Sequence, residues 1–204
     1  MRLSYLFHRC LTVDYTHLPD GLDYATEWIG STLYLYLEHS DGREDWLKNL
    51  DFPSAAYLRD GKAAFHAHRG FLHAHRALEP ILREIAAHPP AAMRIVGYSH
   101  GGALAVLAHE YLFYHCPRLR PQLFSYGFGT PRVLFGGNRT EMRARFLNFT
   151  VVRNQNDIVT HLPPAALGYY HVGKMIKIGE RGNYSPTEAH REENIMRELL
   201  SAGL

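Results

Sequence analysis

The sequence predicts an α/β fold: one domain with a largely parallel central sheet and helices on both faces. Three observations lead to this prediction. Short β-prone apolar runs alternate with longer segments of helical periodicity, as in β–α–β units, whose strands pair in parallel. The chain has 204 residues, of which 46% are hydrophobic, so it is long enough to bury a full core. No repeat or interdomain linker interrupts it, so we expect residues 1–204 to form a single domain.

The first half of the chain contains three predicted strands and one long predicted helix. Two β-prone runs lie within residues 26–39, and the second, residues 32–37, is rich in leucine and tyrosine. Residues 62–68 form the third predicted strand. Residues 70–87 predict an amphipathic helix, because their apolar side chains recur at helical spacing and two prolines follow.

The second half continues the alternation. The predicted elements follow in this order: strand 93–98, helix 101–114, strand 122–128, helix 140–145, strand 146–153, strand 169–178 and helix 185–200. The last helix has a clear start signal, because Ser185-Pro-Thr-Glu188 is a capping box with proline at the first helical position.

Composition excludes several classes of protein. The formal net charge is only +2 and lysine and arginine form no block, so we expect no nucleic-acid partner. Cys10 and Cys116 are too few for a disulfide scaffold, and we expect two reduced thiols rather than one bridge. No stretch approaches the roughly 20 apolar residues of a membrane span. Residues 1–10 lack a cleavage site, so the default compartment is cytoplasmic, and leaderless export is also compatible with the sequence.

The segment Gly97-Tyr-Ser-His-Gly101 is the most informative motif. It joins an apolar run to a helix-prone segment and places Ser99 at the apex of the turn. A nucleophile elbow of the α/β-hydrolase fold has this form, since glycines remove the Cβ atoms that would clash in so tight a turn. The alternative is an ordinary glycine-rich turn. No lysine follows the glycines, which argues against a phosphate loop. We therefore predict that Ser99 is a nucleophile at a helix N-terminus, where backbone N–H groups stabilise negative charge.

A serine nucleophile needs a histidine base and a carboxylate that orients it. In α/β-hydrolases both follow the serine, the carboxylate first. Asp157 is the best candidate, because its polar loop follows a predicted strand, although an Asx-turn would also explain it. Three histidines come later. His161 lies too close in sequence to turn back easily onto this loop, and chain order does not decide between His171 and His190.

Several further motifs accompany the elbow in a fixed order. They are His68-Arg-Gly-Phe71, Phe128-Gly-Thr-Pro-Arg-Val133, Asn156-Asp-Ile-Val with Leu162-Pro-Pro164, Gly168-Tyr-Tyr-His-Val-Gly173 and Ala189-His190. Together with the elbow they resemble the class 3, fungal-type triacylglycerol lipases of the α/β-hydrolase superfamily. The resemblance covers roughly residues 32–200.

The resemblance implies a triad of Ser99, Asp157 and His190, with His171 as the alternative base. It implies hydrolysis of carboxylic esters, with acylglycerols or other lipid esters as substrates and without a cofactor. Two alternatives stay open. One is a catalytically silent α/β-hydrolase scaffold that serves as a binding module, and the other is a hydrolase of phospholipids or thioesters.

The resemblance also predicts the oxyanion hole. One donor is the backbone N–H of His100, directly after the nucleophile, and the other comes from a loop after an earlier strand. In the family that loop reads Arg-Gly-Thr or Arg-Gly-Ser. Ser40 matches its hydroxyl residue, whereas Glu38-His39 replaces Arg-Gly. This departure alters the loop in which the donor lies, and it weakly favours the silent scaffold.

A lid is predicted just beyond this loop. In the family a lid helix lies where this chain has residues 44–50, and a short amphipathic helix there would contact a lipid surface transiently. Its predicted residues are Asp45, Trp46, Leu47 and Leu50. The alternative is an ordinary short helix that packs its tryptophan on the core.

Four histidines close together in sequence raise the question of a metal site. They are His66, His68, His73 and His75. No cysteine or carboxylate cluster accompanies them, and a serine hydrolase needs no metal. We therefore expect no metal ion, and a structural role for His68.

Overall fold

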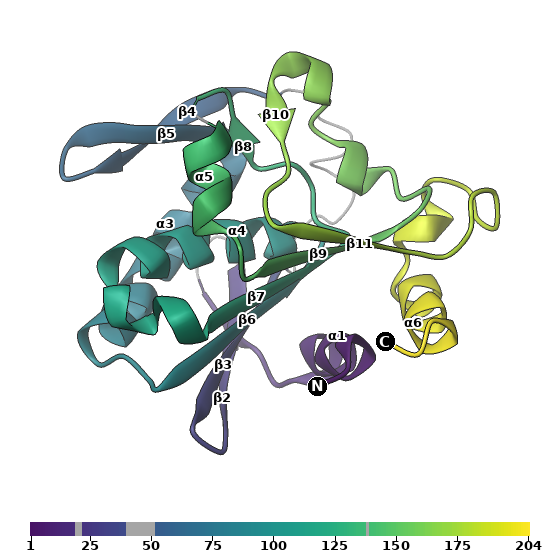
Figure 1. Cartoon of the computed structure of the whole chain (residues 1–204), viewed down its shortest axis with the longest axis horizontal. Coiled ribbons are helices and arrows are strands. Elements are labelled where there is room, and N and C mark those ends of the chain that lie inside the picture. The colour runs from purple at the N-terminus through teal and green to yellow at the C-terminus, as the bar shows by residue number, and fades with distance from the viewer. Residues whose placement is uncertain (19–21, 40–51, 138) are drawn as a thin grey trace.

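The computed structural model describes residues 1–18, 22–39, 52–137 and 139–204 (Figure 1). Within these residues the central sheet has seven strands in the order β1-β2-β3-β6-β7-β9-β11. Their bounds are β1 Thr16–His17, β2 Leu22–Ile29, β3 Thr32–His39, β6 Ala92–Tyr98, β7 Leu123–Phe128, β9 Phe149–Asn154 and β11 Lys174–Ile178. The five strands from β3 to β11 pair in parallel, and β1 and β2 form an antiparallel edge. The predicted, largely parallel sheet is confirmed.

Helices cover both faces of this sheet, as predicted (Figure 1). On one face α4 (His100–His115) packs on the middle strands and α3 (Arg69–Ala87) packs on α4. On the other face lie α1 (Leu3–Thr12) and α6 (Glu192–Ser201), in contact with each other. Helix α1 was not predicted. Its buried apolar residues, Leu3, Leu6, Phe7 and Cys10, nevertheless recur at the spacing of an amphipathic helix, so the signal was present in the sequence.

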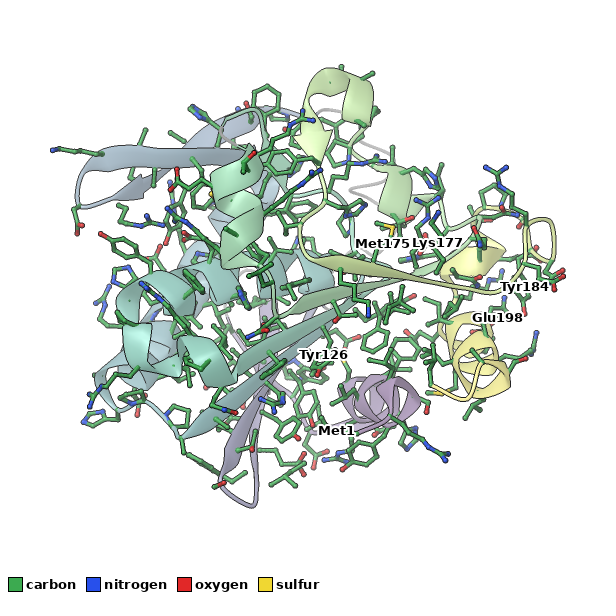
Figure 2. The ribbon with its side chains drawn as sticks, viewed as in Figure 1. Met1, Tyr126, Met175, Lys177, Tyr184 and Glu198 are labelled. Carbon is green, nitrogen blue, oxygen red and sulfur yellow. The ribbon has the colours of Figure 1, made fainter. Side chains whose placement is uncertain are left out.

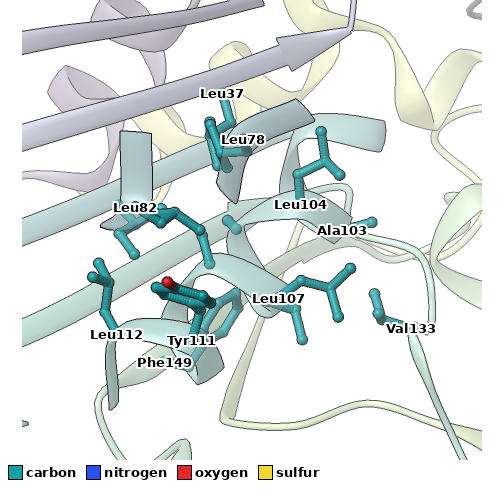
Figure 3. Packing of buried hydrophobic residues seen from close by; sticks show 14 of the residues in the cluster. Leu37, Leu78, Leu82, Ala103, Leu104, Leu107, Tyr111, Leu112, Val133 and Phe149 are labelled. Atoms are coloured by element: carbon teal, nitrogen blue, oxygen red, sulfur yellow. The ribbon is translucent and has the colours of Figure 1, made fainter. Parts of the chain in front are cut away.

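Two hydrophobic cores follow from the two covered faces. In β3, Leu35 and Leu37 point into the core around α4, and Tyr34 and Tyr36 point into the core beneath α1. Side chains of a strand alternate between faces, so a strand buried on both sides is apolar at every position. Figure 3 shows part of the first core, where Leu104 and other side chains of α4 are enclosed by α3 and the sheet. Every residue from 101 to 112 is buried.

A second, smaller sheet lies beyond α3 and α4, and it was not predicted. Among the described residues it has four strands in the order β10-β8-β5-β4. Their bounds are β4 Ser54–Arg59, β5 Lys62–His68, β8 Leu134–Phe135 and β10 Tyr169–Tyr170. The predicted strand 169–178 is therefore divided between two sheets. The break lies at Gly173, which has φ +78° and where a Cβ would approach the Phe149 carbonyl oxygen to 2.3 Å.

The remaining elements are short, and the predicted last helix is interrupted. The short elements are η2 Pro117–Gln122, α5 Arg139–Arg145, η3 Val159–His161, η4 Ala165–Leu167 and η5 Glu188–His190. Instead of one helix over 185–200, the 3₁₀ turn η5 ends at His190. Arg191 is extended, with ψ 144°, and α6 begins after it.

Both cysteines are free and buried. Cys10 lies in the core beneath α1 and Cys116 in the core around α4, so the sheet separates them. Among the described helices, none has the length and hydropathy that crossing a bilayer requires.

Candidate active site

Ser99 lies at the sharp turn between β6 and α4, in strained backbone geometry with φ 53° and ψ −117°. The flanking glycines explain how the turn closes. A Cβ at Gly97 would lie 2.1 Å from the Gly101 carbonyl oxygen, and a Cβ at Gly101 would lie 1.9 Å from the Leu37 carbonyl oxygen. Both positions therefore require glycine, and the chain here has the geometry of a nucleophile elbow.

The structure brings Ser99, His190 and Asp157 together. His190 Nε2 lies 2.8 Å from Ser99 Oγ, and His190 Nδ1 lies 2.9 Å from Asp157 Oδ2. Both distances are those of hydrogen bonds. With its Nδ1–H donated to the carboxylate, the imidazole presents the Nε2 lone pair to the serine hydroxyl. This arrangement can remove a proton from Ser99.

Asp157 is completely buried in the loop that follows β9. Its Oδ1 accepts a hydrogen bond from the Val159 N–H at 2.9 Å, and its Oδ2 faces His190. Asp157 thus makes both contacts at once. One carboxylate oxygen forms the Asx-type bond to the backbone two residues on, and the other contacts the imidazole. The first bond directs the second oxygen toward the histidine.

The other two histidines make different contacts. His161 bonds the main-chain oxygen of Asp157 through Nδ1 and the Arg153 guanidinium through Nε2, so it does bend back onto this loop but not onto the carboxylate. His171 bonds the Thr160 carbonyl oxygen at 2.8 Å, and its burial lowers its pKa to about 4. Neither ring reaches the serine in the described structure.

His190 lies in η5 rather than in the last helix. The capping box forms as predicted: the Ser185 N–H donates to Glu188 Oε2 at 3.0 Å, and the Glu188 N–H donates to Ser185 Oγ at 3.3 Å. These two bonds lie at the start of the short turn, and α6 itself begins at Glu192 without a side-chain cap. The preceding loop is tied to α6, because the Tyr184 hydroxyl donates to Glu198 Oε1 at 2.8 Å (Figure 2).

Gly129 packs directly against the imidazole and carboxylate, a contact that sequence reasoning missed. It has φ +57°, and a Cβ there would lie 2.8 Å from His190 Cε1 and 3.1 Å from Asp157 Oδ2. The residue belongs to the segment Phe128-Gly-Thr-Pro-Arg-Val133, which the resemblance had singled out without a reason for its glycine. Only a residue without a side chain leaves room for the histidine here.

Comparison with known proteins identifies the family. The model of the class 3 lipases matches residues 35–167, more than half of the chain. The chain belongs to the class 3 lipase family. The match includes Ser99 and Asp157 but ends before His190, so the choice of base depends on the geometry above.

Named relatives in the class 3 lipase family come from fungi. A lipase of Rhizomucor miehei is 28% identical over 149 residues, which are 70% of this chain and 40% of that protein. A lipase of Rhizopus niveus is 31% identical over 151 residues, again 70% of this chain and 37% of the relative. The matched part thus spans about two fifths of the length of these relatives.

Solved structures of lipases share the fold. The triacylglyceride lipase of Rhizomucor miehei superposes with a TM-score of 0.70 at 24% identity, covering 82% of this chain and 66% of that one. A lipase from Rhizopus microsporus var. chinensis gives a TM-score of 0.70 at 22% identity, with coverages of 92% and 72%. The chain therefore has the α/β-hydrolase fold.

Of the two predicted oxyanion-hole donors, only His100 lies within the described residues. His100 is the first residue of α4, and its ring packs edge-to-face on Phe71, with centroids 5.1 Å apart. The end of β3 touches the elbow, because the Leu37 carbonyl oxygen lies against Gly101. Glu38 follows on the opposite face of the strand, near Cys10. The two residues that depart from the family pattern, Glu38 and His39, are therefore the last residues of β3, directly after the residue that touches the elbow.

Five predicted residues lie outside the described residues: Ser40, Asp45, Trp46, Leu47 and Leu50. Their roles in the oxyanion hole and the lid stay predictions. In the part of the chain that is described, no group of three or more histidine, cysteine or carboxylate side chains is placed to bind a metal. His68 packs on Phe71 and Tyr169, with ring centroids 4.5 and 6.2 Å away.

Proposed function

We propose that this chain is a serine-dependent carboxylic ester hydrolase that acts on acylglycerols or other lipid esters. One observation carries the proposal: Ser99 Oγ and a buried carboxylate lie within hydrogen-bond distance of the two nitrogens of one imidazole. The family supports it, because the fungal relatives are lipases. One structural neighbour is a triacylglycerol lipase whose catalytic centre is formed by a serine protease triad.

In the first half-reaction Ser99 Oγ attacks the ester carbonyl carbon while His190 Nε2 takes the hydroxyl proton. The carbonyl oxygen becomes an oxyanion, and the new imidazolium is stabilised by the Asp157 carboxylate. Collapse of this intermediate breaks the bond between the acyl carbon and the alcohol oxygen. His190 then returns its proton to that oxygen, so the alcohol leaves and the acyl group remains on Ser99.

Water completes the cycle. His190 Nε2 removes a proton from a water molecule, whose oxygen attacks the acyl carbon. The second intermediate expels Ser99 Oγ, which recovers its proton from His190, and the carboxylic acid departs. In both halves the His100 N–H and Ser40 would donate to the oxyanion, and each such donor is typically worth about 10²–10³ in rate.

The test is Ser99→Ala with a short p-nitrophenyl ester. We expect turnover to fall by at least about 10⁴-fold, because the remaining residues cannot form an acyl-enzyme. Ser31→Ala, at an exposed position between β2 and β3, is the control and should retain full activity. Undiminished hydrolysis by a folded Ser99→Ala variant would overturn the proposal.

Reaction with a fluorophosphonate separates an enzyme from a silent scaffold. The wild-type chain should be labelled at Ser99 alone, whereas a scaffold without an activated serine would stay unlabelled. The lipid preference is tested with p-nitrophenyl esters of increasing chain length, acylglycerols, phospholipids and thioesters. A rate that rises sharply above the aggregation threshold of an acylglycerol would support a lid, and preference for a thioester or phospholipid would replace the proposed substrate class.

A further inference from the structure

In the described structure, the turn that carries His190 leaves two of its three carbonyl groups, those of Ala189 and His190, without backbone partners, whereas the Glu188 carbonyl accepts the Arg191 N–H at 3.0 Å. Arg191 is extended, so the backbone hydrogen bonds of η5 do not continue into α6. In an uninterrupted helix the carbonyls of Ala189 and His190 would accept bonds from N–H groups four residues on. Ala189 is fully buried, and buried carbonyls need other donors.

Side chains donate to all three carbonyls of the turn, as the sole donors to those of Ala189 and His190 and as a second donor to that of Glu188 among the described residues. Asn194 Nδ2 donates to the Glu188 oxygen at 2.8 Å, Asn154 Nδ2 to the Ala189 oxygen at 3.0 Å, and the Tyr98 hydroxyl to the His190 oxygen at 2.5 Å. We call these three side chains the carbonyl clamp. They come from α6 and from the ends of two strands of the central sheet, β9 and β6.

Two residues of the carbonyl clamp, Tyr98 and Asn154, lie close in sequence to the other two members of the proposed triad. Tyr98 immediately precedes Ser99, and Asn154 lies three residues before Asp157. The strands that present the nucleophile and the carboxylate therefore also hold the backbone of the base. The Tyr98 ring stacks on the His190 imidazole as well, with centroids 5.2 Å apart and planes at 23°. The same sheet thus positions Ser99 and Asp157 and also holds the histidine that lies between them.

Packing alone does not account for a polar side chain at position 154. Asn154 is 1% exposed, and its Oδ1 has no hydrogen-bond partner among the described residues. An isolated buried amide is costly, and an apolar residue would fill this site without that cost. The hydrogen bond from its Nδ2 to the Ala189 carbonyl oxygen explains why an amide side chain occupies this position.

We propose that Tyr98 and Asn154 are positioning residues that hold the His190 backbone, and through it the imidazole, in line with Ser99 and Asp157. This inference rests on the proposed ester hydrolysis only for its kinetic test. Neither residue touches the substrate in this scheme. Their loss changes the geometry of proton transfer, so it lowers kcat and leaves KM nearly unchanged.

The kinetic test compares two tyrosine-to-phenylalanine substitutions. Tyr98→Phe removes the hydroxyl bond to the His190 carbonyl and keeps the stacked ring. Tyr36→Phe is the matched control, because Tyr36 is fully buried in the same core and its hydroxyl donates to Glu27 at 3.3 Å, away from the turn. We expect kcat to fall roughly 10- to 100-fold in Tyr98→Phe and in Asn154→Ala. We expect less than about a twofold change in Tyr36→Phe, with KM unchanged in all three.

A readout without substrate uses NMR of the His190 ring. The Nδ1 proton that bonds the Asp157 carboxylate resonates downfield of the amide protons, and it should shift or broaden in Tyr98→Phe but not in Tyr36→Phe. A sharp wild-type signal that is lost in Tyr98→Phe, in a chain that cleaves no ester, would refute the proposed function and support the clamp. An active Tyr98→Phe variant with wild-type kcat and an unchanged signal would overturn the clamp. An equal loss in Tyr36→Phe would overturn it too.

Discussion

Gly129→Ala is the substitution whose effect the structure specifies most closely. The new Cβ would lie 2.8 Å from His190 Cε1 and 2.9 Å from Nδ1. Carbon atoms pack best at about 3.5–4.0 Å, so the imidazole must retreat by roughly 0.7–1.2 Å. A displacement of about 1 Å at the reacting groups can cost on the order of 10²-fold in rate. We therefore expect Gly129→Ala to lower turnover by roughly 100-fold.

The chain offers a matched control in Gly136. Both glycines have φ +57°, but a Cβ at Gly136 meets no atom within 4 Å. The backbone cost of alanine in this conformation, about 1–2 kcal/mol, is therefore common to both variants. The free energy of unfolding of Gly136→Ala should fall by that amount, and its esterase activity should stay at the wild-type level. The comparison separates strain in the backbone from displacement of the histidine.

Three measurements check this prediction: hydrolysis of a p-nitrophenyl ester, the rate of fluorophosphonate labelling, and unfolding in urea. Gly129→Ala should be slow in the first two and destabilised by at least as much as Gly136→Ala in the third. The reasoning fails if Gly129→Ala keeps more than about half of the wild-type rate, or if Gly136→Ala loses activity to the same extent.

Two further predictions concern stability. The buried histidines have their pKa lowered by burial to about 4, from an ordinary 6.5; they are His75, His109 and His171. Because the unfolded chain binds their protons first, stability should be full above about pH 6.5 and fall toward pH 4, by on the order of 3 kcal/mol for each histidine. Urea unfolding at several pH values checks this. If the free energy of unfolding of His109→Gln fell with decreasing pH as steeply as that of the wild type, the reasoning would be contradicted. Glu110→Gln should cost about 3–5 kcal/mol, because this buried carboxylate pairs with Arg59 and Arg145, whereas Glu141→Gln, the exposed partner of Arg145, should cost at most about 1 kcal/mol. Equal losses in these two variants would contradict the reasoning.

Local patterns predicted the parallel strands of the central sheet and helices α3, α4 and α5, because such patterns depend only on neighbouring residues, whereas α1 was missed and the last helix is interrupted. The strand–turn–helix around Ser99 is such a case, since glycines on both sides of one serine admit few other backbones. The position of Asp157 follows from a general rule about the carboxyl ends of parallel strands. The second sheet follows no such rule. Two of its strands, β8 and β10, have two residues each, too few for a period to show.

His190, the proposed base, illustrates what a sequence alone leaves open. The capping box at Ser185 and Glu188 signals the start of a helix, and its two hydrogen bonds form. The same signal says nothing about where that turn stops. Its end at His190 is stabilised by Tyr98 and Asn154, which lie 92 residues before His190 and 35 residues before Ala189, respectively. In a continuous helix each residue is rotated by about 100° from the one before it. If the turn ran on into α6, the position of His190 in that helix would therefore fix the direction of its side chain. Because the helix is interrupted at Arg191, the direction of the His190 side chain does not follow from the local motif. It depends on the contacts of the turn with Tyr98 and Asn154 at the ends of two sheet strands.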